Sequence, residues 1–288
     1  MTSYKSYDTY RETRIKQLSE EIRKEGNFIM YGKWRDEVRK EYKHILPILG
    51  KNTRESRINA LKDYLDVTIK ECFITKKSKG RKEPLHPNVH HVNSSQLLCY
   101  MVFSEMLNED LTPTDTLIDF LAALGLNITS KARCSFEYHD NWRWKEECEP
   151  EGTSFDFHIH DGENEYFFEI KFTENGFGKA PNDDRHRQKI QEIYLPKMVS
   201  KYNLLPTVEN IQKNYQIFRN ILRSDSPNKK VIFITDGKNV ATNKALGAFK
   251  KDFPGFCHDG VIFKSWQEVC AKLPKNLAKT FQFVCFEE

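Results

Sequence analysis

The chain has 288 residues, of which 39% are hydrophobic and 30% charged, a composition typical of a folded globular protein and not of a disordered one. Lysine and arginine exceed aspartate and glutamate by only four charges, too few to diagnose a nucleic-acid-binding protein. We expect no membrane association, because no apolar run approaches the ~20 residues that cross a bilayer and the polar start lacks a signal peptide. The seven cysteines are scattered without a Cys-x-x-Cys pair. They argue against a disulfide framework or a structural zinc site and favour a cytoplasmic protein with reduced thiols.

Helices are predicted for the first part of the chain. Asn52 and Thr53 can cap a helix whose apolar residues, spaced three and four apart, extend to Ile69. After a break, Ser94 or Ser95 begins a second helix. A third helix is marked at both ends in the sequence. Thr112 is its expected cap, Pro113 takes the first helical position, and Gly125 ends the helix.

A dense run of positive charge lies between the first two of these helices and consists of Lys76, Lys77, Lys79, Arg81 and Lys82. Such a run is most often a solvated loop. If the chain binds DNA, this run is its densest positive segment, and we then expect it to contact phosphates rather than bases.

The pattern changes after residue 130, where three alternating strands are predicted over residues 131–139, 153–160 and 165–172. A long helix is predicted from Asn182, with a kink or interruption at Pro196, and another helix from Thr207. The apolar run 231–234 is typical of a buried central strand. The remaining predicted elements are a strand at 261–263, a helix from Ser265 and a strand at 281–286.

This order of elements predicts an α/β fold in which a mixed β-sheet is flanked by helices. We assign the sheet and its helices to residues 91–288. Residues 1–90 form an N-terminal helical region that carries the basic run.

The second and third strands form a hairpin around Asp161-Gly162. Alternation assigns to its apolar faces the side chains of Phe155, Phe157, Ile159, Phe168, Ile170 and Phe172. The polar faces carry Asp156, His158, His160, Glu169 and Lys171. A turn centred between Gly162 and Glu163 places Asp156 directly opposite Glu169, with Cβ atoms ~4.5–5.5 Å apart.

Two facing carboxylates repel each other unless a cation lies between them or one of them is protonated. Carboxylate oxygens suit a hard divalent ion such as Mg²⁺. Lys171, two residues beyond Glu169 on the same face, can orient a water and stabilise a developing oxyanion. These groups meet the requirements for hydrolysing a phosphodiester, in which the metal ion polarises the phosphate and activates the attacking water.

The spacing of Asp156 and Glu169-Ile170-Lys171 resembles the PD-(D/E)xK nuclease superfamily, with Phe155 in place of the proline that gives the motif its name. Three segments resemble more narrowly a bacterial family of restriction endonucleases: Ser94-Ser95-Gln96, residues 169–174 with Phe177-Gly178, and Phe218-Arg219-Asn220. The resemblance covers roughly residues 90–235.

This resemblance implies a restriction-endonuclease-like core and a DNA endonuclease that uses Mg²⁺, with Mn²⁺ as a substitute. It implies that Asp156, Glu169 and the backbone carbonyl of Ile170 bind the metal ion and that Lys171 is the catalytic lysine. A further polar residue is expected from the first core helix or strand, and both Gln96 and Glu137 are candidates. The expected partners are double-stranded DNA, a second copy of the chain in a homodimer, and, for a restriction enzyme, a cognate DNA methyltransferase.

Two other functions are compatible with these residues. The first is a non-catalytic nucleic-acid-binding protein descended from a nuclease, although such a protein has no need of the complete carboxylate–lysine set. The second is a metal-dependent hydrolase with a barrel fold, because Asp156-x-His158-x-His160 matches a motif of such enzymes. However, too few residues follow His160 to complete an eight-stranded barrel. We interpret His158 and His160 as part of a polar strand face, and His186 as part of a solvated helix turn.

Overall fold

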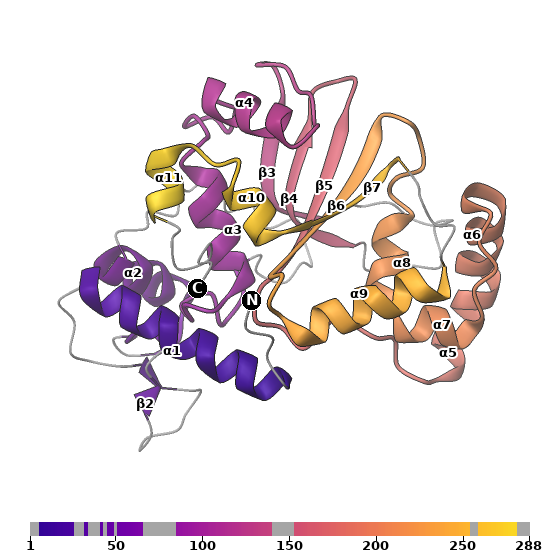
Figure 1. Ribbon diagram of the computed structural model, residues 1–288, viewed down its shortest axis with the longest axis horizontal. Helices are drawn as coiled ribbons and strands as arrows, with labels where there is room; N and C mark the ends of the chain where they lie inside the picture. Colours follow the sequence, from indigo (N-terminus) through magenta and orange to yellow (C-terminus); the bar gives the residue numbers. More distant parts are fainter. Residues whose placement is uncertain are drawn as a thin grey trace.

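Five strands of the computed structural model form one mixed sheet in the order β3-β4-β5-β6-β7 (Figure 1). The structure describes residues 6–25, 32–33, 41–42, 45–48, 51–65, 85–139, 153–253 and 259–280. The strands are β3 (Arg133–His139), β4 (Ser154–His160), β5 (Glu165–Lys171), β6 (Lys229–Thr235) and β7 (Val261–Ser265). The first three are antiparallel to one another, whereas β5, β6 and β7 are parallel. The predicted mixed α/β fold is therefore confirmed, and it is consistent with a restriction-endonuclease-like core.

Helical connections join the parallel strands, as parallel pairing requires. Between β5 and β6 lie α5 (Asp184–Lys189), the π-helical turn η2 (Ile190–Tyr194), α6 (Leu195–Tyr202), α7 (Val208–Lys213) and α8 (Tyr215–Ile221). Helix α9 (Val240–Asp252) joins β6 to β7. The remaining elements are α1 (Tyr7–Glu25), the short strands β1 (Gly32–Lys33) and β2 (Glu41–Tyr42), α2 (Arg54–Leu65), α3 (Ser95–Ser104), α4 (Asp115–Ala123), α10 (Trp266–Cys270) and α11 (Lys275–Thr280).

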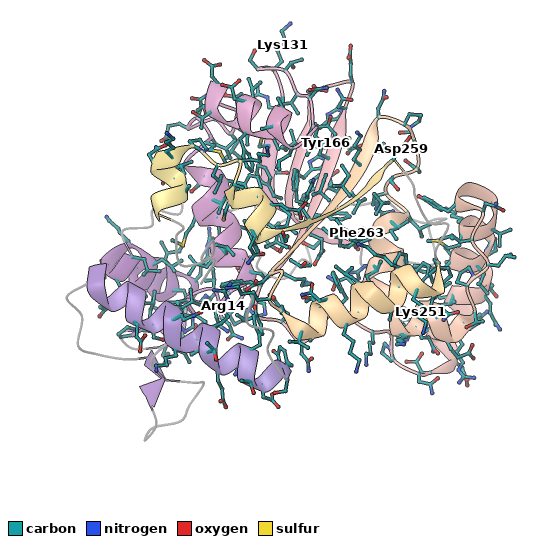
Figure 2. All side chains as sticks on the ribbon, viewed as in Figure 1. Arg14, Lys131, Tyr166, Lys251, Asp259 and Phe263 are labelled. Atoms are coloured by element: carbon teal, nitrogen blue, oxygen red, sulfur yellow. The ribbon has the colours of Figure 1, made fainter. Side chains whose placement is uncertain are left out.

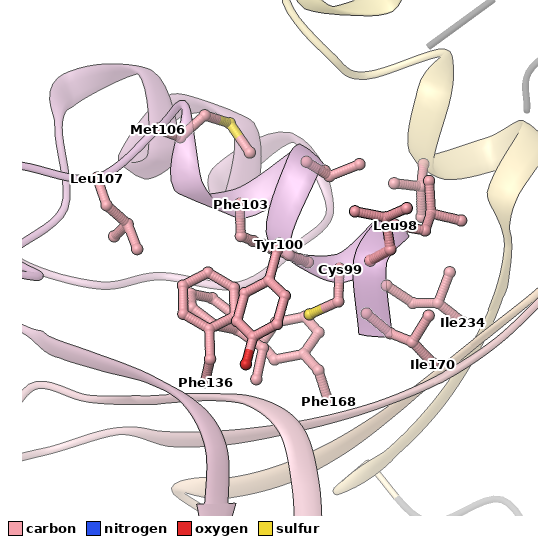
Figure 3. Packing of buried hydrophobic residues seen from close by; sticks show 14 of the residues in the cluster. Leu98, Cys99, Tyr100, Phe103, Met106, Leu107, Phe136, Phe168, Ile170 and Ile234 are labelled. Atoms are coloured by element: carbon pink, nitrogen blue, oxygen red, sulfur yellow. The ribbon is translucent and has the colours of Figure 1, made fainter. Parts of the chain in front are cut away.

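The sheet is buried on both faces, between two helical layers (Figure 1). One hydrophobic cluster joins it to α2, α3, α4, α10 and α11, and Figure 3 shows α3 packed there, with Tyr100 and Phe103 against Phe136 and Phe168. A second cluster joins the other face to η2, α6, α7, α8 and α9. The sheet is thus the middle of three layers, which explains why β6 is apolar on both sides, as Val231 and Ile232 belong to different clusters.

Several predicted helix starts are confirmed. The side chain of Thr53 accepts a hydrogen bond from the backbone of Ser56, and Ser94 is the cap of α3. Thr207 and Ser265 each form a capping box at the start of α7 and α10.

Other predicted boundaries were wrong by one or two residues. Thr112 is not the cap of α4, because its hydroxyl donates to Asp110 in the preceding turn, and Thr114 takes the cap position. The helix predicted from Asn182 is instead capped by Asp183. It is interrupted by the π-helical turn just before Pro196, which confirms the predicted interruption.

The N-terminal helix α1 packs against the carboxyl ends of β5 and β6. Tyr10 donates a hydrogen bond to the carbonyl of Phe172 and another to Asp236, and Tyr7 donates to the carbonyl of Thr173. Arg14, which Figure 2 labels on α1, forms an ion pair of 2.8 Å with Asp236, and both side chains are buried. The domain boundary at residue 90 stays a prediction, but α1 contacts the sheet directly.

Some predictions fall outside the described residues, namely the basic run at 76–82 and the strand at 281–286. The expectation that all thiols are reduced is wrong for Cys270, which is disulfide-bonded, whereas Cys99 and Cys134 are free and buried. None of the helices in the described part of the chain is long and apolar enough to span a membrane.

Candidate active site

The β4–β5 hairpin has the predicted register. Phe157 pairs with Phe168 and His158 with Phe167, so Asp156 and Glu169 come next along the two strands. The turn is closed by Asp161, whose carboxylate accepts hydrogen bonds from the backbone of Glu163 and Asn164. Gly162 has a φ of +94° there, a conformation that glycine adopts without strain.

Asp156 lies where the β4–β5 pairing ends. Its Oδ2 accepts a hydrogen bond of 2.6 Å from the backbone N–H of Ile170 and so takes the place of a strand carbonyl. The prediction that Phe155 shares a face with Phe157 was wrong, since Phe155 packs in the cluster under α8 and Phe157 in the cluster under α3. The alternation of β4 is therefore broken at Asp156.

Glu137 lies on β3 opposite Asp156, because its neighbours Phe136 and Tyr138 pair with Phe157 and Phe155. Its φ of +49° is rare for a residue with a side chain. Strained backbone of this kind is concentrated at functional sites. The unusual backbone of Glu137 lies opposite the break in alternation on β4. Acidic residues from three neighbouring strands, Glu137, Asp156 and Glu169, thus lie in one row.

Gln96, the other candidate for the additional polar residue, contacts this row from α3. Its side chain is buried and forms a hydrogen bond with the carboxyl group of Glu137. Its Oε1 accepts a hydrogen bond of 2.8 Å from the backbone of His86. The two candidates are thus in contact with each other, and Gln96 links the row to the segment before α3.

Glu169 is the most strongly held of the three carboxylates. Its side chain is only 4% exposed, and Lys171 Nζ lies 2.6 Å from its Oε1. Two side-chain amides of α8 also bind it, with Gln216 Nε2 2.7 Å from Oε1 and Asn220 Nδ2 2.8 Å from Oε2. Neither Gln216 nor Asn220 was among the site residues predicted from the sequence. A signal was present in the sequence, because Asn220 belongs to the segment Phe218-Arg219-Asn220 that resembles the restriction endonuclease family.

Burial and charge act together on the row. Burial raises the pKa of Asp156 well above its usual range, and the charges of Glu169 and Glu137 raise it further. Burial, with the charge of Glu169, also raises the pKa of Glu137 to about 7. Burial alone would lower the pKa of Lys171, but the carboxylates of Glu169, Glu174 and Asp156 outweigh it and raise that pKa. The raised pKa values of Asp156 and Glu137 mean that their charged forms are disfavoured in this row, and a bound cation would stabilise those charged forms.

The donor set fits a hard divalent cation held by few protein ligands. No group of three or more histidine, cysteine, aspartate or glutamate side chains in the described ranges is arranged to hold a metal ion. Asp156 and Glu169 are two carboxylates on neighbouring strands. Mg²⁺ is commonly bound by one or two carboxylates and keeps several of its waters. The residues present thus fit Mg²⁺ better than zinc, which takes a fuller set of nitrogen or sulfur ligands.

The histidines of the hairpin do not join this site. His158 is buried, lies 3.0 Å from Glu165 and stacks on Tyr138, and His160 is exposed near the turn. His186 bonds to Asp183 in the first turn of α5, as expected for a helix cap. Five of the described strands form an open sheet, unlike the closed barrel that the Asp-x-His-x-His alternative requires.

Comparison with known proteins identifies a family for this chain. No curated protein and no solved structure matches the chain. A family model described as "Restriction Endonuclease associating with ARP" matches residues 16–283, which include every residue of the candidate site. The chain therefore belongs to this restriction endonuclease family, which suggests a nuclease.

Proposed function

We propose that this protein is a Mg²⁺-dependent endonuclease of the PD-(D/E)xK type that hydrolyses phosphodiester bonds of double-stranded DNA. The observation that carries the proposal is the contact of Lys171 with Glu169, on the strand next to Asp156, in a chain of a restriction endonuclease family. A protein that only binds DNA gains nothing from burying surplus carboxylates, because they repel phosphate and destabilise the fold.

Asp156 and Glu169 would hold the Mg²⁺ ion, together with the backbone carbonyl of Ile170, and Mn²⁺ would substitute for it. When bound, the ion polarises the scissile phosphate and lowers the pKa of a water. Lys171 keeps its ammonium group charged, so that it can orient the attacking water and stabilise the charge that develops on the phosphate. Glu137, held by Gln96, supplies the additional polar group beside the two ligands.

The partners follow from the reaction. Cutting both strands of a DNA site is simplest with two active sites related by a two-fold axis, so we propose a homodimer. Lys76, Lys77, Lys79, Arg81 and Lys82 would contact the DNA phosphates. A restriction enzyme also needs a cognate DNA methyltransferase that protects the cell's own DNA, and we place the protein in the cytoplasm with that DNA.

The test is cleavage of supercoiled plasmid and genomic DNA of varied sequence and methylation, with Mg²⁺, with Mn²⁺ and with EDTA. We expect cleavage with either metal ion and none with EDTA. Asp156→Ala and Lys171→Met should each lower the rate at least ~100-fold. Asp119→Asn, which changes an exposed residue of α4, should leave the rate unchanged.

Wild-type protein that binds DNA but cleaves none of these substrates would instead support the non-catalytic nucleic-acid-binding protein. Sedimentation of the protein alone and with DNA tests the homodimer, and a monomer in both samples would contradict it.

A further inference from the structure

We propose that Gln216 and Asn220 are positioning residues that hold the Glu169 carboxylate so that its Oε2 binds the metal ion. This inference rests on the proposed function, because it assumes that Glu169 is a ligand. It concerns two residues of α8 that reach Glu169 from a helix 47 and 51 positions further along the chain.

The hydrogen bonds to Glu169 are unequal at its two oxygens. Oε1 accepts from Lys171 Nζ at 2.6 Å and from Gln216 Nε2 at 2.7 Å. Oε2 accepts only from Asn220 Nδ2, at 2.8 Å, among the described residues. A carboxylate oxygen has two lone pairs. Both lone pairs of Oε1 are therefore occupied, whereas one lone pair of Oε2 is left for a metal ion.

The orientation of the Gln216 amide is determined by its second partner. The backbone N–H of Gly178 donates to Gln216 Oε1 at 3.0 Å, and a backbone N–H can only donate. The Nε2 group must therefore face Glu169. The backbone N–H of Gln216 also donates to the carbonyl of Gly178. Gln216 thus connects Glu169 to the segment that follows β5, and its own position is set by two bonds to one residue.

Asn220 is polar but fully buried, and its neighbours Ile217, Phe218 and Ile221 belong to the apolar core. An amide in such a place is costly unless it is hydrogen-bonded. Its Nδ2 bonds to Glu169, and its Oδ1 accepts a longer bond of 3.4 Å from the hydroxyl of Thr153. A leucine would suit this core position better if no carboxylate had to be held. The amide is therefore best explained by its bond to Glu169.

Groups that orient a metal ligand usually change metal affinity 10–100-fold when removed. We would measure Mg²⁺ and Mn²⁺ binding by calorimetry for the full chain and for Gln216→Ala and Asn220→Ala. The matched control is Gln212→Ala on α7, whose side chain donates hydrogen bonds to Pro181 and Asn182. Circular dichroism and thermal unfolding in EDTA identify any variant that does not fold. If Asn220→Ala fails this check, Gln216→Ala, whose side chain is only half-buried, carries the test.

We expect both variants to bind the metal ions 10–100-fold more weakly than the wild type and the control, and to recover much of their DNA cleavage when the metal concentration is raised. A purely structural role would lower the unfolding temperature without changing metal affinity, and that result would overturn the inference. A wild type that binds Mn²⁺ but cleaves no DNA would refute only the proposed endonuclease, because the affinities still decide the positioning role. A wild type that binds neither ion would overturn both.

Discussion

Asp156 is half-buried, and burial and the neighbouring carboxylates of Glu137 and Glu169 both act against its negative charge. Lys171 offsets only part of this repulsion, since its closest partner is Glu169. A residue selected for stability alone would not be acidic here. Functional sites commonly carry such a cost, which a bound ligand then removes.

Asparagine at position 156 removes the charge but keeps an oxygen that can accept from the Ile170 N–H. We therefore expect Asp156→Asn to be more stable than the wild type in EDTA, by about 1 kcal/mol. Added Mg²⁺ should raise the unfolding temperature of the wild type and leave that of the variant unchanged. Thermal unfolding of both proteins checks this, with Asp119→Asn as the control for the same substitution at an exposed site. A less stable Asp156→Asn would show that the carboxylate serves the fold.

At the scale of single elements, the sequence predicted contacts between neighbours in the chain better than contacts between distant segments. The β4–β5 register followed from alternation and one turn, because the hairpin is local. The contacts of Gln216 and Asn220 with Glu169 depend on how α8 packs on the sheet, and no local pattern records that packing. The reversal at Phe155 was missed for a similar reason, since it accompanies the unusual backbone of Glu137 on another strand.

Glu165 joins three strands at the turn end of the sheet. Its carboxylate lies 3.0 Å from His158 on β4 and 3.3 Å from Lys229 on β6. Burial acts to raise its pKa, but the hydrogen bond and charge of His158, together with Lys229, outweigh burial and lower the pKa below its usual 4.5. A lowered carboxyl pKa stabilises the fold above pH 4.5, and this contribution is lost as the pH falls through the lowered value.

Glu165→Gln should therefore lower the free energy of unfolding at pH 7 by roughly 1.5–3 kcal/mol, the usual contribution of hydrogen bonds to a charged group. The difference between wild type and variant should shrink as the pH falls below 4.5. Urea unfolding at a series of pH values measures this difference in the free energy of unfolding. Glu163→Gln, at an exposed position in the neighbouring turn, is the control. A difference that is the same at pH 7 and at pH 3 would contradict this explanation.

At the scale of the whole molecule, α1 is joined to the sheet by buried polar groups. The buried side of α1 runs through Tyr10, Arg14 and Leu18, spaced four residues apart. The arginine in the middle of this stripe obscures its helical pattern, which is why the predicted N-terminal helical region gave no bounds for this helix. In the fold, Arg14 pairs with Asp236, and Asp236 also accepts hydrogen bonds from Tyr10 and Gln267. The first helix is thereby bonded to the residue that follows β6.

Breaking a buried ion pair by changing one partner typically costs ~3–5 kcal/mol, because the other charge stays buried. We expect a loss of this size in the free energy of unfolding for Arg14→Met and for Asp236→Asn. The double variant should lose less than the two single losses together, since no uncompensated charge is left in it. Urea unfolding followed by tryptophan fluorescence checks this, and Lys16→Met, on the exposed side of α1, is the control. We expect one cooperative transition, because α1 and the sheet share buried contacts. Two separate transitions, or a loss below about 1 kcal/mol in both single variants, would show that α1 folds independently of the sheet.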